Sequence, residues 1–78
     1  MKQTAYVIVT EKKTGLVEDV HCVYCDDSVF EERLRDRFFS ACNMECSDFD
    51  KYSGEDLNAI FEDGFFETGK KIVQIFVA

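Results

Sequence analysis

The two ends of the chain place the strongest constraint on its fold. Residues 5–9 (AYVIV) and 72–77 (IVQIFV) are short runs of mainly β-branched and aromatic side chains, which favour β-strands. Successive strand residues point to opposite faces of a sheet, so Tyr6 and Ile8 fall on one face and Val7 and Val9 on the other. A sheet covered by helices on one side only would alternate apolar with polar residues. We therefore expect something to cover the second face as well.

The small size of the chain limits what that cover can be. With 78 residues it forms one domain, residues 1–78, and folding removes only about 60–65% of its surface from water. An apolar face of several hundred square ångströms is rarely left open, so we expect a homodimer or an obligate partner. The rival expectation is that a second helix and the Phe65-Phe66 segment wrap around to cover it.

The first half of the chain reads as a hairpin followed by a helix. Residues 4–10 and 16–26 are rich in Val, Ile, Tyr and Thr and flank a polar loop that ends at Gly15, which indicates a β-hairpin. Ser28 with Glu31 three residues later has capping-box spacing and predicts a helix over 29–42. Helical periodicity gives that helix one buried face, formed by Phe30, Leu34, Phe38, Ala41 and Cys42.

The second half completes an α+β domain. Residues 43–52 have no clear period and are expected to form a loop, after which Ser53 and Gly64 bound a short helix. A short strand or extended arm at 65–68, a turn at 69–70 and a last strand at 71–77 follow. The predicted fold is a single-layer antiparallel or mixed sheet of three to four strands with two helices, in the order β-β-α-α-(β)-β.

The four cysteines are expected to be reduced and to fill space in the core or an interface. Nothing in the sequence directs the chain out of the cytoplasm, and no run is apolar and long enough to span a membrane. Their spacing, C-x2-C-x16-C-x3-C, leaves a zinc site as an alternative. The first pair argues against it, because an offset of three along a strand sends the two side chains to opposite faces unless a bulge intervenes. The alternative ligands are Cys22, Cys25, Cys42 and Cys46.

No constellation of residues points to catalysis or to a cofactor. The only histidine, His21, adjoins Cys22 on a predicted strand, so their side chains point apart and form no dyad. The four glycines are isolated and make no phosphate-binding loop. Arg33 and Arg37, with Glu32 and Asp36, are expected to form a solvated, ion-paired helix surface. We therefore expect a protein that is not an enzyme.

Charge is concentrated in one segment of the sequence. Residues 45–63 hold seven acidic side chains and one basic one, a net charge of −6 in a chain of net charge −7. Such a surface repels nucleic acid and anionic membranes and attracts basic proteins. Aromatic residues lie in or next to this segment, at Phe49, Tyr52, Phe61, Phe65 and Phe66. The alternative interpretation is that these aromatics form the core under the second helix and that the charge only confers solubility.

These features predict a non-enzymatic, cytoplasmic protein-binding module. We expect an inhibitor or accessory protein of phage or mobile-element type, which presents an acidic-aromatic surface to a basic, nucleic-acid-handling partner as a nucleic-acid mimic. Phe49, Tyr52 and Phe61 would be its anchors if they are exposed. Two alternatives are a zinc-stabilised regulatory domain and a structural homo-oligomer. The predicted partner-binding residues are Asp48, Asp50, Tyr52, Glu55, Asp56, Glu62 and Asp63.

Overall fold

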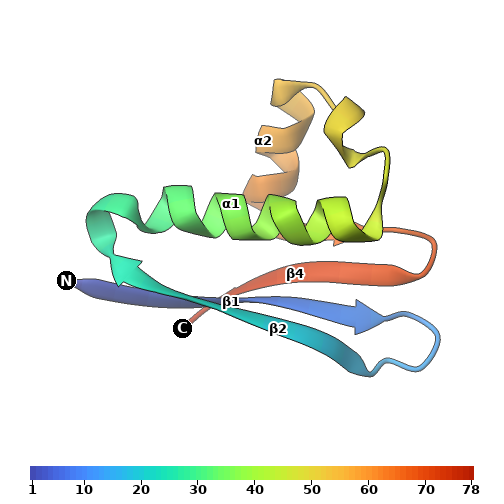
Figure 1. Ribbon diagram of the computed structural model, residues 1–78, viewed down its shortest axis with the longest axis horizontal. Helices are drawn as coiled ribbons and strands as arrows, with labels where there is room; N and C mark the ends of the chain where they lie inside the picture. Colours follow the sequence, from blue (N-terminus) through green and yellow to red (C-terminus); the bar gives the residue numbers. More distant parts are fainter.

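The chain folds around a four-stranded antiparallel sheet. The computed structural model describes residues 1–78, and strands β1 (Lys2–Glu11) and β2 (Val17–Asp26) form the predicted hairpin (Figure 1). The chain returns through β3 (Phe65–Glu67) and β4 (Lys71–Val77), which gives the strand order β2-β1-β4-β3. β4 pairs with β1 over residues 5–11, so the two most apolar strands occupy the centre of the sheet. The predicted α+β class is confirmed.

One face of the sheet packs against helix α1 (Asp27–Glu45), which runs roughly along the strands (Figure 1). The helix buries the five residues that its periodicity predicts, among them Phe38 and Cys42, which are fully buried. This burial of apolar surface is the main stabilising contribution that a chain of this size can make. The sheet contributes to the same core Ala5, Val7, Val9, Val23, Phe66 and Val73.

The start of α1 differs from the prediction. The N-cap is Asp26, whose Oδ1 accepts hydrogen bonds from the backbone N and the Oγ of Ser28, each at 3.1 Å. The predicted N-cap, Ser28, lies inside the helix. The reason is that the Asp27 N–H still donates to the Met1 carbonyl at 2.9 Å, so the strand runs directly into the helix and leaves no linker residue before Ser28.

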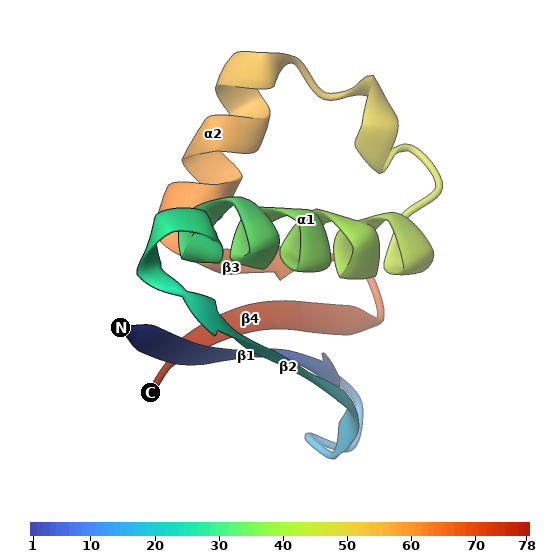
Figure 2. The same cartoon turned by 60° about the vertical axis from the view of Figure 1, so that its left-hand side comes forward.

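The segment after α1 is more ordered than the loop predicted for residues 43–52. Three of its residues, 43–45, extend α1, and a short 3-10 turn, η1 (Phe49–Lys51), follows. Helix α2 (Gly54–Asp63) then begins and ends where predicted, because Ser53 Oγ accepts from the Asp56 N–H at 3.2 Å and Gly64 adopts a left-handed φ of 65°. Both η1 and the start of α2 lie beyond α1 on the side away from the sheet, and the end of α2 returns beside α1 to β3 (Figure 2).

An arginine and a group of aromatic rings hold α2 against α1. The Arg35 guanidinium carbon lies 4.9 Å from the centre of the Phe39 ring and 5.4 Å from that of Phe61, and Arg35 also donates to Asn58 of α2. The Phe61 ring in turn lies 6.3 Å from Phe38. These contacts keep α2 on the same side of the sheet as α1.

The other face of the sheet is therefore left uncovered. The rival expectation, that the second helix and the Phe65-Phe66 segment wrap around it, is wrong: α2 packs on α1, and Phe66 points into the core on the helical side. Only Phe65 reaches the second face, and it covers little of it because β3 is three residues long and lies at the edge. Neither helix is long and apolar enough to cross a membrane.

Candidate protein-binding site

The predicted partner-binding residues all lie on the surface. We call them the acidic surface: Asp48, Asp50, Tyr52, Glu55, Asp56, Glu62 and Asp63, each of which is exposed. They belong to η1, α2 and the turn before and between these two elements, which together project beyond α1 (Figure 2). The structure thus places five of the seven residues on a projecting part of the molecule, and Glu62 and Asp63 at the end of α2, next to β3.

The carboxylates of the acidic surface are almost entirely free of ion pairs. Only Asp48 has a basic partner, Lys51, at 3.1 Å, and the other five carboxylates have none within 4 Å. Glu62 and Asp63 lie in the last turn of α2, where the negative end of the helix dipole opposes them by about 0.3–1 kcal/mol each. The fold therefore gains nothing from these two charges, which leaves them available to a partner.

The aromatic residues of the segment mostly belong to the core. Phe49 is only 2% exposed, and its ring centre lies 4.9 Å from that of Phe66 and 5.5 Å from that of Phe39. Phe61 packs between α1 and α2. Only Tyr52 is well exposed, at 41%, with its ring edge-on to Phe49 at 5.6 Å. Of the three predicted anchors, Phe49, Tyr52 and Phe61, only Tyr52 is exposed enough to contact a partner.

The four thiols of the alternative zinc site are not brought together. Cys22 is exposed on the uncovered face of the sheet, whereas Cys25 lies on the helical face, as their offset of three residues predicts. No group of three or more His, Cys, Asp or Glu side chains has the geometry to hold a metal ion. Cys42 is fully buried, and burial followed by the proximity of Cys46 raises the pKa of its thiol to about 12. It is therefore a packing residue rather than a nucleophile.

His21 forms a contact within its own strand and has a structural role. Its ring is 22% exposed at the edge of the helical face, and its Nε2 lies 3.1 Å from Asp19 Oδ2. The pair joins two residues of the same strand that point to the same side. No cysteine or serine completes a catalytic arrangement with it in the hydrogen bonds of the structure.

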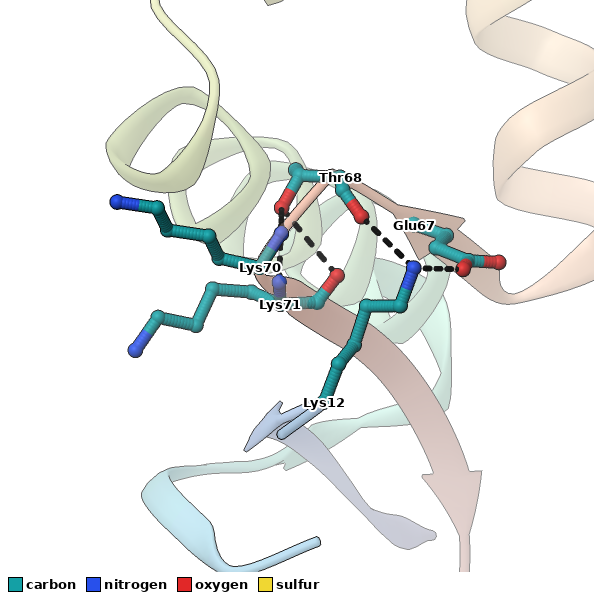
Figure 3. A network of polar contacts seen from close by, with 5 residues as sticks. All are labelled: Lys12, Glu67, Thr68, Lys70 and Lys71. Atoms are coloured by element: carbon teal, nitrogen blue, oxygen red, sulfur yellow. Dashed lines mark hydrogen bonds and ion pairs between the residues drawn. The ribbon is translucent and has the colours of Figure 1, made fainter. Parts of the chain in front are cut away.

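A basic cluster lies at the far end of the sheet, where the two hairpin turns meet. Lys12 pairs with Glu67 and also donates to the Thr68 carbonyl at 3.3 Å (Figure 3). Lys71 pairs with Glu18, and this contact lowers the pKa of Glu18 and raises that of Lys71. Each of these two lysines thus links the ends of two strands that are separated by a third strand in the sheet. The two ion pairs connect the two turns and have a structural role. The Lys70 side chain extends away from them (Figure 3).

The exposed side of α1 carries charges that do not pair with each other. Glu32, Arg33, Asp36 and Arg37 are all exposed, and they line a shallow groove of about 530 Å³ together with Val29 and Ser40. No ion pair forms among the four within 4 Å, so the expected solvated surface is present but the expected ion pairing is wrong.

The uncovered face of the sheet contains residues that the sequence reasoning missed. Strand β2 adds Val20, Cys22 and Tyr24 to it, of which Tyr24 is 65% exposed. The period-two alternation of residues 20–24 was the available signal. We call this surface the open face and define it by cross-strand register. Its centre comprises Thr4, Tyr6, Ile8, Thr10, Val20, Cys22, Tyr24, Phe65, Ile72, Gln74 and Phe76, and the same register places Lys2, Val17, Asp26 and Glu67 at its rim.

The functional inference rests on these surfaces alone. Comparison with known proteins gave no match to a family model, to a curated protein or to a solved structure.

Proposed function

We propose that the chain is a non-enzymatic protein-binding module whose acidic surface binds a basic, nucleic-acid-handling protein. One observation carries the proposal: five of the six carboxylates of the acidic surface have no ion pair and are exposed. Unpaired carboxylates keep their full charge for an incoming partner, because no internal cation neutralises them.

The chemistry of such a partner follows from this charge. A protein that binds nucleic acid presents Lys and Arg side chains to phosphates, and an array of carboxylates offers those same side chains an alternative set of anions. The acidic surface would therefore occupy the place of nucleic acid on its partner. Tyr52 is the exposed aromatic side chain of this acidic segment and is available to add an aromatic contact.

The biological class follows by analogy only. Small size, acidity and the lack of a catalytic constellation are shared with inhibitor and accessory proteins of phages and mobile elements, and we assign the chain to that class on these grounds. We place its activity in the cytoplasm, where its four free thiols would stay reduced.

Charge reversal tests the proposal directly. The double variant Asp56→Lys/Glu62→Lys changes two exposed carboxylates of α2, and Glu32→Lys/Asp36→Lys makes the same change in net charge on the exposed side of α1. We expect the first variant to bind a Lys/Arg-rich peptide about tenfold more weakly than wild type, mainly through the association rate. The control variant should bind much like wild type.

The salt dependence and a competitor complete this test. Binding of the wild-type protein to the peptide should weaken as salt is added, and the α2 variant should show a smaller dependence. With a DNA-binding protein captured by the wild-type chain, duplex DNA should compete for the same site. Binding that is independent of salt, or an equal loss in both double variants, would contradict the proposal.

A further inference from the structure

The open face is a continuous surface whose centre carries no charged residue. Its residues form cross-strand rows, such as Phe76–Tyr6–Cys22 and Phe65–Gln74–Ile8–Val20, and its charged residues, Lys2, Asp26 and Glu67, lie only at the rim. In a chain in which 32% of residues are charged, this concentration of neutral side chains sets the face apart from the rest of the surface. Five of its large side chains are exposed, namely Tyr6, Val20, Tyr24, Phe65 and Phe76.

The area of the open face is sufficient for a specific interface. Three strands about 4.8 Å apart, over roughly seven residues of 3.3 Å each, together with the three-residue β3, give a plan area on the order of 400 Å². Side-chain relief adds to this value, so two copies packed face to face would bury roughly 1,000 Å² or more in total, which reaches the lower limit for specific interfaces. The apolar character of the face matches what the centre of such an interface requires.

The charge distribution favours a second copy as the occupant. Two chains of net charge −7 repel each other, but the acidic residues of the open face lie at its rim, where Glu67 pairs with Lys12 and Asp26 with the amino terminus. Most of the acidic surface, on η1 and the first turns of α2, lies on the far side of α1 (Figure 2), so face-to-face packing keeps these residues of the two copies apart. Only Glu62 and Asp63, at the end of α2, lie close to the edge strand β3.

We propose that the open face packs against the same face of a second copy to form a two-layered β-sandwich dimer. Tyr6, Tyr24 and Phe76 would lie in its interface, and the two acidic surfaces would point outward in opposite directions. The inference does not depend on the function proposed above, since it uses different residues.

Pairing of two β2 edges is the competing geometry for a dimer. The Asp27 N–H donates to the Met1 carbonyl, and along an antiparallel pair every second residue is hydrogen-bonded to the partner strand. The backbone N–H and C=O groups of Val20, Cys22 and Tyr24 therefore point away from β1, at the free edge of the sheet. The side chain of Asp19 already accepts from the Val20 N–H at 3.0 Å. An antiparallel register centred on Cys22 would also place Glu18 opposite Asp26 of the second copy. These acidic groups discourage edge pairing.

The test is the mass of the intact protein in solution as a function of concentration, measured by sedimentation equilibrium. Wild type should show twice the 9.0 kDa chain mass and dissociate on dilution. Phe76→Lys and Tyr24→Lys should each shift the dimer to monomer, because each buries a charge in the interface. Both changes lower the net negative charge, so added repulsion between copies cannot cause the loss. Met44→Lys, at a 75% exposed position on α1, is the matched control and should remain dimeric.

Cys22 provides a second readout on the unmodified chain. It is exposed on the open face, so its alkylation should slow as the protein concentration rises, whereas Cys46, on the α1 side, should react at a constant rate. A monomer at all concentrations would overturn the proposal. A dimer that survives both lysine substitutions, with the amide protons of Val20, Cys22 and Tyr24 protected from exchange, would overturn it in favour of edge pairing.

Discussion

Phe49 and Tyr52 are three residues apart and have different roles. Phe49 lies between two exposed carboxylates in the sequence, yet its own ring is buried among those of Phe39 and Phe66. Tyr52 contacts the same cluster with its edge and leaves much of its ring in water. A single turn of 3-10 helix thus separates a core residue from a surface residue, and only the surface residue is available to a partner.

We predict that Phe49→Ala destabilises the protein by about 3–5 kcal/mol, because it empties a fully packed site. For a domain of this size that loss is a large part of the total stability, so the variant should be mostly unfolded at moderate temperature. Tyr52→Ala should cost about 1 kcal/mol or less. Urea unfolding followed by circular dichroism measures both values, and equal losses would show that Phe49 is not the core residue described above.

The buried thiol of Cys42 makes a prediction about alkaline pH. Its pKa is raised from the ordinary value of 9.0 to about 12, so between these values the unfolded chain loses the proton while the folded chain keeps it. The stabilising effect of the protonated thiol is thus complete below pH 9.0 and is lost as the pH rises toward 12, by up to about 1.4 kcal/mol per pH unit.

Cys42→Ala separates this effect from the titration of Lys and Tyr side chains in the same range. The variant should be less stable than wild type at pH 7, by about 1–2 kcal/mol for the lost packing. Its stability should then fall less steeply than that of wild type above pH 9. Parallel curves of unfolding free energy against pH for the two proteins would contradict the assignment.

At the level of elements, the cap of α1 decides where the sheet ends and the helix begins. Asp26 is the last residue of β2 and also the N-cap, and its hydrogen bonds from Ser28 lower the pKa of its carboxyl group. A lowered pKa means that the cap stabilises the fold above the ordinary pKa of an aspartate, and that this stabilisation is lost as the pH falls.

We therefore expect Asp26→Ala to cost about 1 kcal/mol at neutral pH and Ser28→Ala only a few tenths. The difference between wild type and Asp26→Ala should shrink at acidic pH, where the carboxyl group is protonated. Thermal unfolding of the three proteins at two pH values measures this. A larger loss of stability for Ser28→Ala than for Asp26→Ala would show that Ser28 is the N-cap, as the capping-box pattern predicts.

Elements set by local patterns could be predicted from the sequence. The hairpin depends on its turn, the buried face of α1 on helical periodicity, and α2 on the Ser53 cap and the left-handed Gly64. The position of α2 could not be predicted, because it depends on contacts between two helices. Arg35 and Phe39 of α1 pack together, and Arg35 also contacts Phe61 of α2. No local signal encodes such a contact.

The candidate sites divide in the same way. The net charge of residues 45–63 can be read from composition, and charged side chains are rarely buried, so the exposure of the carboxylates of the acidic surface could be predicted. Whether Phe49 faces water or the core depends on packing against Phe66, which lies far away along the chain. The open face could be foreseen in part, because β1 and β4 are apolar on both sides, but its lack of cover follows from the placement of α2 on α1.

At the scale of the whole molecule, two surfaces of opposite character lie on opposite sides. Most of the acidic surface projects beyond α1, and the open face is the side of the sheet that faces away from α1 (Figure 2). A dimer formed through the open face would display two acidic surfaces facing apart. It could then hold two basic partners at once, or two sites on one large partner, with the gain in avidity that bivalent binding brings.

Hydroxyl-radical footprinting of the intact protein tests this central claim most directly, because it reports the exposure of Tyr24, Phe76 and Tyr52 in one measurement. Raising the protein concentration should protect Tyr24 and Phe76 and leave Tyr52 unchanged. Adding a Lys/Arg-rich peptide should protect Tyr52 and leave the other two unchanged. Protection of all three residues together by either treatment, or of none by both, would contradict the account of two separate interaction surfaces.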